Sequence, residues 1–200
     1  MSMSYLDSHL EAAPTQAPAI SQLADFWQKK LWHQMADALM EVTRNEYFQQ
    51  NGRLLEMHER FVLSFADSLK QLVFVQFSVA ASKQLSDAKS ALAFIEKVAK
   101  LEHVQNDHQA ALMCKLEAAH LLVIAGNIEL AKTELAQSKK LQDEYPGIME
   151  TVVYSKYHLV SLCLFKATDQ ASKYFASAML YLTYTPLDSI PIDEASVPSR

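Results

Sequence analysis

Glu117 and His120 are the two residues whose types and spacing come closest to a site for metal chemistry. They stand three positions apart, and in a helix this spacing places both side chains on one face. Di-iron helical bundles use such a Glu-x-x-His arrangement, but they need two copies of it and two further glutamates that project inward. No second Glu-x-x-His occurs in the sequence. We therefore expect Glu117 and His120 to form a local carboxylate–histidine contact in a crowded helix.

The other histidines show weaker patterns. His58 is followed by Glu59 but lacks the second histidine, four positions later, that a zinc-protease helix requires. His103 and His108 are five positions apart, which is out of phase for one face of a helix. We expect His103 and His108 to be solvated loop residues, and no histidine pattern predicts a metal centre.

Cys114 and Cys163 lie within apolar helical patterns, and neither has a second cysteine at metal-binding spacing. Apolar surroundings raise the pKa of a thiol, so we expect both to be buried, reduced thiols in a reducing compartment. The three glycines stand far apart, which excludes a glycine-rich phosphate loop. The sequence thus predicts no catalytic residue, no metal and no cofactor, and it identifies no partner-binding residue.

Composition narrows the class of protein further. Half of the 200 residues are apolar, the formal net charge is -5, and the basic residues are scattered. A phosphate backbone needs a basic stripe and a membrane span needs about 20 apolar residues, so we expect neither a nucleic-acid nor a membrane partner. Because no catalytic or cofactor site is predicted, we also expect no small-molecule substrate. The N-terminus also lacks the pattern of a signal peptide. No proline occurs in residues 19–145, which predicts an all-α fold, because proline disrupts helix interiors.

The clearest structural element is a pair of helices over residues 108–125 and 128–145, separated by a turn at Gly126-Asn127. The first helix is apolar on every side and therefore needs neighbours all round. The second has one apolar stripe and one charged side, as expected of an outer helix that covers an inner one. Its stripe comprises Ile128, Leu130, Ala131, Leu135, Leu141 and Tyr145. Such a unit cannot bury its own apolar surface, so it must stack on further helices.

The rest of the chain yields seven more helices and two irregular ends. We predict helices over residues 22–30 (with Ser21 as N-cap), 32–43, 53–65, 72–83, 87–100, 148–165 and 170–182. Residues 72–81 are rich in Val and Phe and also suit a buried strand, but no second strand candidate exists to pair with them. The expected organisation is a flexible arm at 1–18, a helical-repeat domain at 19–185 and an irregular tail at 186–200.

Small residues recur shortly after three helix starts, at Ala91, Ala131 and Ala171-Ser172, with a spacing of about 40 residues. We interpret the chain as a right-handed stack of antiparallel helix pairs, a degenerate tetratricopeptide-like solenoid of about eight to nine helices. We assign most aromatic side chains to its core and allow Tyr181 and Tyr184 a partner contact. The core aromatics are Trp27, Trp32, Phe61, Phe65, Phe74, Phe77, Phe94 and Tyr174.

A series of short motifs points to a known family. They are Lys30–Gln34, Leu55–Phe65, Ala91–Lys97, Met113–Lys115, Pro146-Gly147, Ser155–Tyr157, Ala171-Ser172 with Tyr174-Phe175, and Ile190-Pro191. Their order and spacing over residues 20–195 resemble the N-terminal helical region of the non-ATPase regulatory subunit 13 family of the 26S proteasome lid. Leu101–Asn106 and the first 18 residues match this pattern poorly.

This resemblance implies a helical-repeat arm that, in the family, precedes a PCI module, and it implies that the chain stops before that module. It also implies a non-catalytic scaffold in the cytoplasm and nucleus that supports lid assembly during ubiquitin-dependent proteolysis. The implied partners are other lid subunits, including PCI neighbours and the ubiquitin-receptor subunit. Two alternatives remain: a free-standing adaptor that binds a peptide or partner protein, and a metal-dependent bundle enzyme that uses Glu117 and His120.

Overall fold

The computed structural model describes residues 5–6, 10, 14–145 and 147–185, and these residues form helices and no strand. The all-α prediction is therefore confirmed. Ten helices of seven residues or longer are present in this part of the chain, slightly more than the eight to nine expected. The described chain divides into two compact units, Met1–Cys114 and Lys115–Arg200, called here the N-terminal unit and the C-terminal unit.

The N-terminal unit is organised around α6, a helix that is apolar on nearly all sides. Helix α6 packs against α3, α5 and α7, and α2 packs against α3. The elements of this unit are η1 Pro14–Gln16, α2 Ala17–Gln28, α3 Trp32–Arg44, α4 Glu46–Gln49, α5 Arg53–Arg60, η2 Val62–Ser68, α6 Gln71–Ser82, α7 Ala88–Ala99, α8 Glu102–Gln105 and the start of α9 His108–Ile124. The ambiguous apolar run is therefore a helix, as predicted.

Most predicted helix bounds differ from the structure by one to three residues, and two helices differ more. Helix α2 begins at Ala17, with Pro18 in its first turn, so Ser21 lies inside the helix and the predicted N-cap is wrong. Proline fits there because the first N–H groups of a helix have no intrahelical partner. The predicted helix 53–65 is interrupted at Phe61, where α5 ends and the 3-10 helix η2 follows. This break accounts for the additional helix.

Two residues within the predicted arm also pack in this unit. Tyr5 and Leu6 are buried, and the Tyr5 hydroxyl donates to the carbonyl of Arg53. Burial is the main cause that raises the pKa of Tyr5 above its usual value.

Gln84 connects the loop after α6 to the start of α5. Its Oε1 accepts from the backbone N–H groups of Leu54 and Leu55 at 2.9 and 3.3 Å, and its Nε2 donates to the Phe48 carbonyl at 2.7 Å. The N–H groups at the start of a helix lack intrahelical acceptors, so Gln84 caps α5 from a residue about thirty positions away. Helix α7 is capped locally, because Asp87 accepts from the backbone N–H of Ser90.

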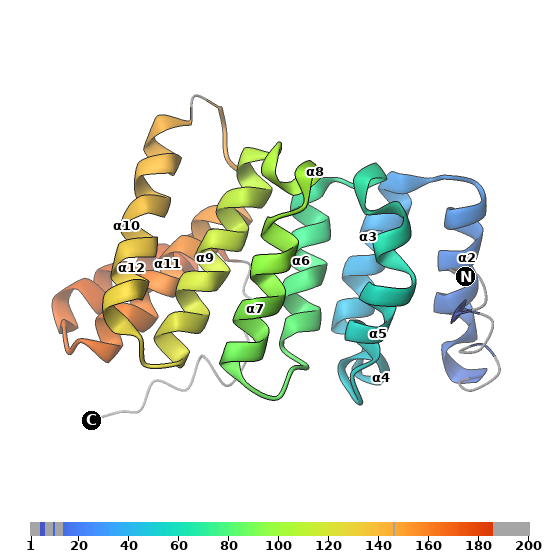
Figure 1. Ribbon diagram of the computed structural model, residues 1–200, viewed down its shortest axis with the longest axis horizontal. Helices are drawn as coiled ribbons and strands as arrows, with labels where there is room; N and C mark the ends of the chain where they lie inside the picture. The colour runs from blue at the N-terminus through green and yellow to red at the C-terminus, as the bar shows by residue number, and fades with distance from the viewer. Residues whose placement is uncertain (1–4, 7–9, 11–13, 146, 186–200) are drawn as a thin grey trace. The chain divides into compact units, whose positions relative to one another are not determined.

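The C-terminal unit contains the remainder of α9 together with α10 Ile128–Glu144, α11 Thr151–Ala167 and α12 Ala171–Tyr184. Helices α11 and α12 pack along much of their length, and α10 packs against α11 (Figure 1). The turn after α9 falls at Gly126, whose φ of 79° is the left-handed conformation that favours glycine at a helix C-terminus. The predicted break between α9 and α10 is thus confirmed.

The apolar stripe of α10 is narrower than predicted. Ala131, Leu135 and Ser138 are buried, whereas Leu130 and Leu141 are exposed. The exposed pair lies to one side of the buried positions on the helix, so apolar character alone overstated the buried face.

The recurring small residues have different roles. Ala91 and Ala131 are each the fourth residue of their helix and are buried, but Ala171 and Ser172 open α12 and are exposed. The third member of the proposed repeat is therefore wrong in register. The handedness of the helix stack and the solenoid interpretation remain predictions.

Candidate functional site

A buried polar cluster in the C-terminal unit contains the two residues with which the sequence analysis began. Glu117 and His120 come from α9, and Lys156 and Cys163 come from α11. Glu117 is only 2% exposed and forms an ion pair with Lys156. Lys156 Nζ also lies 3.1 Å from His120 Nδ1, and Cys163 Sγ lies 3.9 Å from His120 Nε2. The cluster therefore fixes two helices to each other through charged and polar contacts.

The contacts of His120 assign its protonation. A lysine ammonium is only a donor, so Lys156 donates to Nδ1 and the ring carries its proton on Nε2, facing Cys163. The 3.9 Å between Glu117 Oε1 and His120 Nδ1 is too long for a hydrogen bond. Glu117 and His120 are therefore close to each other, as expected, but no hydrogen bond joins them. Lys156 contacts both residues and is the stronger partner of each.

Lys156 also determines the charge of Glu117. Burial by itself would raise the pKa of this carboxyl, but the Lys156 ammonium outweighs it and holds the pKa at about 2. The carboxylate is therefore ionised at neutral pH and already has a cationic partner. Within the described ranges, no three His, Cys, Asp or Glu side chains are arranged to hold a metal ion. Sequence reasoning missed Lys156, because its distance of 39 positions from Glu117 shows no pattern in the sequence.

A second buried polar group, His58, lies in the N-terminal unit. It is 2% exposed, its ring stacks against Phe74 and Phe77, and it meets Phe94 edge-on. Ser78 Oγ donates to the Phe74 carbonyl at 2.8 Å, so the 3.0 Å contact between Ser78 and His58 has Nε2–H as its donor. His58 Nδ1 then has no hydrogen-bond partner among the described residues. Desolvation lowers the pKa of His58 to about 4, which keeps the ring neutral at physiological pH.

The predictions for the remaining histidines and for the two cysteines are confirmed only in part. His103 is half-buried, places Nδ1 2.6 Å from Gln71 Oε1 and meets Phe74 edge-on, so the prediction of a solvated loop residue is wrong for it. His108 is exposed, as expected. Cys114 is a buried thiol, as predicted, whereas Cys163 is only half-buried beside His120.

The aromatic residues that were predicted to lie in the core differ in how far they are buried. Phe61, Phe65, Phe74 and Phe77 are buried, and the other four predicted core aromatics, Trp27, Trp32, Phe94 and Tyr174, are half-buried. The possible partner contact of Tyr181 and Tyr184 remains a prediction. Tyr181 is buried, and Tyr184 stacks on Tyr154 and His158 of α11.

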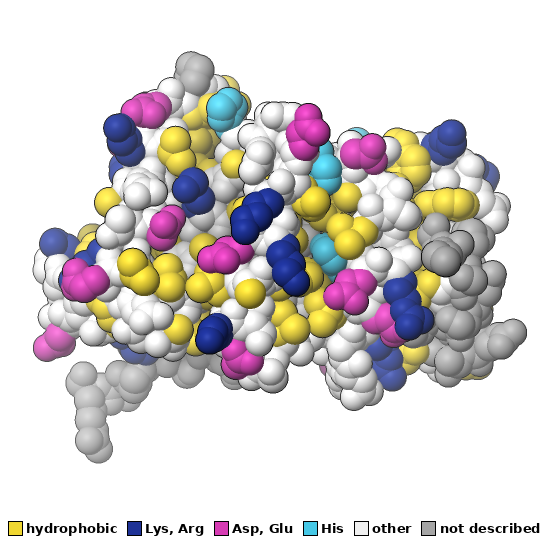
Figure 2. Space-filling model, viewed as in Figure 1, with side chains coloured by type: hydrophobic (Ala, Val, Ile, Leu, Met, Phe, Trp, Pro, Cys, Tyr) yellow, Lys and Arg dark blue, Asp and Glu magenta, His cyan; other side chains and the backbone are white. Residues whose placement is uncertain are grey.

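The exposed face of α12 instead presents Phe175 and Met179, which are 64% and 67% exposed, and Leu182. Their i, i+4, i+7 spacing forms one stripe, which we call the α12 stripe. Sequence reasoning missed this stripe because α12 has apolar residues on both sides, and the sequence does not state which side meets α11. On the face drawn in Figure 2, basic and acidic side chains are interspersed over the surface. No described helix combines the length and apolar character needed to cross a membrane.

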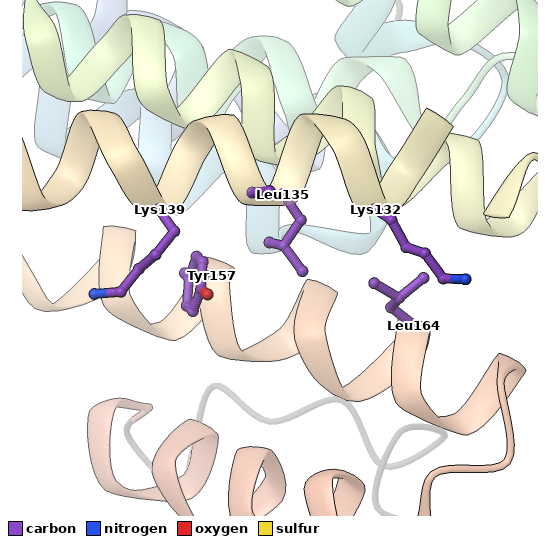
Figure 3. Close-up of a pocket in the computed structure, with 6 residues that line it drawn as sticks. Lys132, Leu135, Lys139, Tyr157 and Leu164 are labelled. Atoms are coloured by element: carbon purple, nitrogen blue, oxygen red, sulfur yellow. The ribbon is translucent and has the colours of Figure 1, made fainter. Parts of the chain in front are cut away.

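An open groove lies between α10 and α11 in the C-terminal unit. It has a volume of about 320 Å³ and is lined by Lys132, Leu135, Ala136, Lys139, Tyr157 and Leu164 (Figure 3). The lining side chains are apolar except for two lysines and the hydroxyl of Tyr157.

Comparisons with known proteins agree with the helical character of the chain. The family described as PSD13 N-terminal repeats matches residues 19–198. The 26S proteasome non-ATPase regulatory subunit 13 homolog B of Arabidopsis thaliana is 26% identical, over 94% of this chain and 49% of the plant protein. The subunit 13 of Dictyostelium discoideum is 24% identical over 96% of this chain and 50% of its own length.

A fungal relative gives similar coverage. The 26S proteasome regulatory subunit RPN9 of Saccharomyces cerevisiae is 22% identical over 92% of this chain and 49% of its own length. The chain thus spans about half the length of the curated relatives it matches. Because the family model matches nearly all of the helical region, the chain belongs to the PSD13 N-terminal repeat family.

Proposed function

We propose that this chain is the helical-repeat arm of a proteasome regulatory subunit, acting as a non-catalytic scaffold of the regulatory-particle lid. In this role it supports lid assembly and subunit contacts in ubiquitin-dependent protein degradation. The family match over residues 19–198 carries the proposal. The relatives are named as non-ATPase regulatory subunits of the 26S proteasome.

Two structural features support a scaffold role. The titratable residues that suggested chemistry in the sequence are engaged in packing: Glu117 by Lys156, and His58 within a cage of phenylalanines. The α12 stripe exposes large apolar side chains, and contiguous exposed apolar surface is typical of protein-interaction sites. The proposed partners are other lid subunits, including PCI neighbours and the ubiquitin-receptor subunit, and the proposed location is the cytoplasm and nucleus.

The proposed organisation follows the family. Residues 19–185 form the proposed repeat arm, and residues 186–200 form the proposed tail that follows it. The predicted tail at 186–200 and most of the predicted arm at 1–18 lie outside the described residues.

Affinity purification tests this function. The natural full-length protein, tagged in its own cells, should recover the other regulatory-particle subunits in comparable amounts. Recovery of the tagged protein at normal abundance without those subunits would contradict the proposal. A deletion of residues 19–185 should lower the recovery of lid neighbours, and a tag-only strain gives the background.

A further inference from the structure

The groove between α10 and α11 has an apolar centre with a cation at each end. Leu135 of α10 lies in its middle and points toward α11, whereas Tyr157 and Leu164 of α11 lie nearer its ends, beside Lys139 and Lys132 respectively (Figure 3). Lys132 and Lys139 extend toward opposite ends of the groove. They stand seven residues apart on α10, so their Cα atoms are about 10 Å apart, two turns of helix.

The charges of this groove favour an acidic ligand. Its described lining contains two lysines and no carboxylate. Each lysine pairs with a carboxylate outside the lining: Lys132 with Glu129, and Lys139 with Asp143, both at 2.7 Å. Both pairs are solvent-exposed, and such pairs contribute about 1 kcal/mol or less. A carboxylate from a partner can therefore share or replace these contacts at small cost.

We propose that this groove binds an acidic amphipathic helix of a partner protein. The helix places one large apolar side chain among Leu135, Tyr157 and Leu164, and one carboxylate near each of Lys132 and Lys139. A helix fits because acidic residues two turns apart match the lysine spacing, and an apolar residue midway between them lies on the same face. This inference rests on the proposed scaffold function, for which it specifies the chemistry of one contact.

A nucleic acid is the competing ligand for two lysines, but the groove does not suit it. Phosphate backbones are bound by extended basic surfaces, whereas this groove has an apolar floor in a chain of net charge -5. An acidic helix uses both the lysines and the apolar floor.

The test uses a fluorescein-labelled, alanine-based helical peptide with two glutamates two turns apart and a leucine midway between them. Two matched peptides replace the glutamates with lysine or the leucine with alanine. In anisotropy titrations with the chain, the glutamate peptide should bind at least about tenfold more tightly than the lysine peptide and about fivefold more tightly than the alanine peptide.

Charge-reversal variants locate the binding site. The double variant Lys132→Glu with Lys139→Glu should weaken binding of the glutamate peptide at least about tenfold. It should strengthen binding of the lysine peptide, because the charges at both ends of the groove are inverted. Lys140→Glu is the matched control: it lies on the same helix, pairs with Glu144 and does not line the groove, so it should change binding less than about twofold. Circular dichroism checks that the variants remain helical.

Three results would overturn the inference. They are equal binding of the glutamate and lysine peptides, unchanged binding by the double variant, and displacement of the peptide by a single-stranded oligonucleotide that binds as tightly. The purification experiment reports separately on the proposed function. If the peptide assay fails while lid subunits still co-purify, only the proposed binding of an acidic helix in the groove is contradicted. Peptide binding without co-purification keeps the groove and removes the lid assignment.

Discussion

The carboxylate of Glu117 on α9 and the ammonium of Lys156 on α11 form an ion pair that is almost completely removed from solvent. His120 accepts a hydrogen bond from the same ammonium. The pair therefore joins two helices of the C-terminal unit. A buried charge whose partner is removed is costly, because it keeps its desolvation penalty without the compensating attraction.

We expect Lys156→Met to destabilise the protein by about 3–5 kcal/mol, since it leaves Glu117 buried without its cation. The double variant Glu117→Leu with Lys156→Met should recover most of that loss, because neither charge remains. Urea unfolding followed by circular dichroism measures both changes. Lys140→Met is the exposed control and should change stability by less than about 0.5 kcal/mol. A double variant as unstable as Lys156→Met alone would show that the charges themselves are not the cause.

The neutral, buried His58 predicts a loss of stability in mild acid. Its pKa is about 4 in the folded protein and about 6.5 when exposed, so the unfolded chain binds the proton more readily. Stability from this group is therefore complete above pH 6.5 and falls as the pH drops toward 4. At about 1.4 kcal/mol per pKa unit, the loss between pH 7 and 4.5 is about 2–3 kcal/mol.

Tryptophan fluorescence can follow this transition, because both tryptophans, Trp27 and Trp32, lie in the N-terminal unit with His58. His58→Leu should remove most of the pH dependence above pH 4.5, whereas His33→Gln, at an exposed position, should retain it. Glu117 acts in a lower window, since its stabilisation is present above about pH 4.5 and is lost as the pH falls toward 2. A His58→Leu protein with the same pH dependence as the parent would exclude His58 as the source.

Gln84 should contribute more to the stability of the N-terminal unit than an ordinary loop glutamine does. We expect Gln84→Ala to destabilise the N-terminal unit by about 1–3 kcal/mol, because two N–H groups of α5 and the Phe48 carbonyl lose their partner. Gln105→Ala, at an exposed position on α8, is the control and should change stability by less than about 0.5 kcal/mol. Chemical unfolding monitored by tryptophan fluorescence gives both values. Equal effects of the two substitutions would contradict the capping role.

The α12 stripe should promote self-association of the isolated chain without contributing to its folding. We expect Phe175→Ser with Met179→Ser to reduce association in sedimentation velocity at high concentration, with stability changed by less than about 1 kcal/mol. Tyr181→Ala, on the buried side of the same helix, should instead cost about 3 kcal/mol. If the serine variant unfolded as readily as Tyr181→Ala, the stripe would be covered in the folded protein.

Much of the secondary structure follows from local sequence. The absence of proline from residues 19–145 and the apolar periodicity predicted the helices, and Gly126 marked the turn between α9 and α10. The break at Phe61 was not predictable, because residues 53–65 keep a helical apolar pattern while the backbone turns into a 3-10 helix. Ser21 failed as a cap because the helix extends back through Pro18.

By itself, the sequence determined the all-helical class, the apolar character of α6 and α9, and the resemblance that led to the family, because these depend on local composition and order. Tertiary structure decided which residues meet across helices. It paired Glu117 with Lys156, surrounded His58 with phenylalanines, connected Gln84 to α5 and left Phe175 exposed. The physical reason is that the 3.6-residue period of a helix specifies which side chains share a face, whereas the neighbour of that face depends on how distant helices pack.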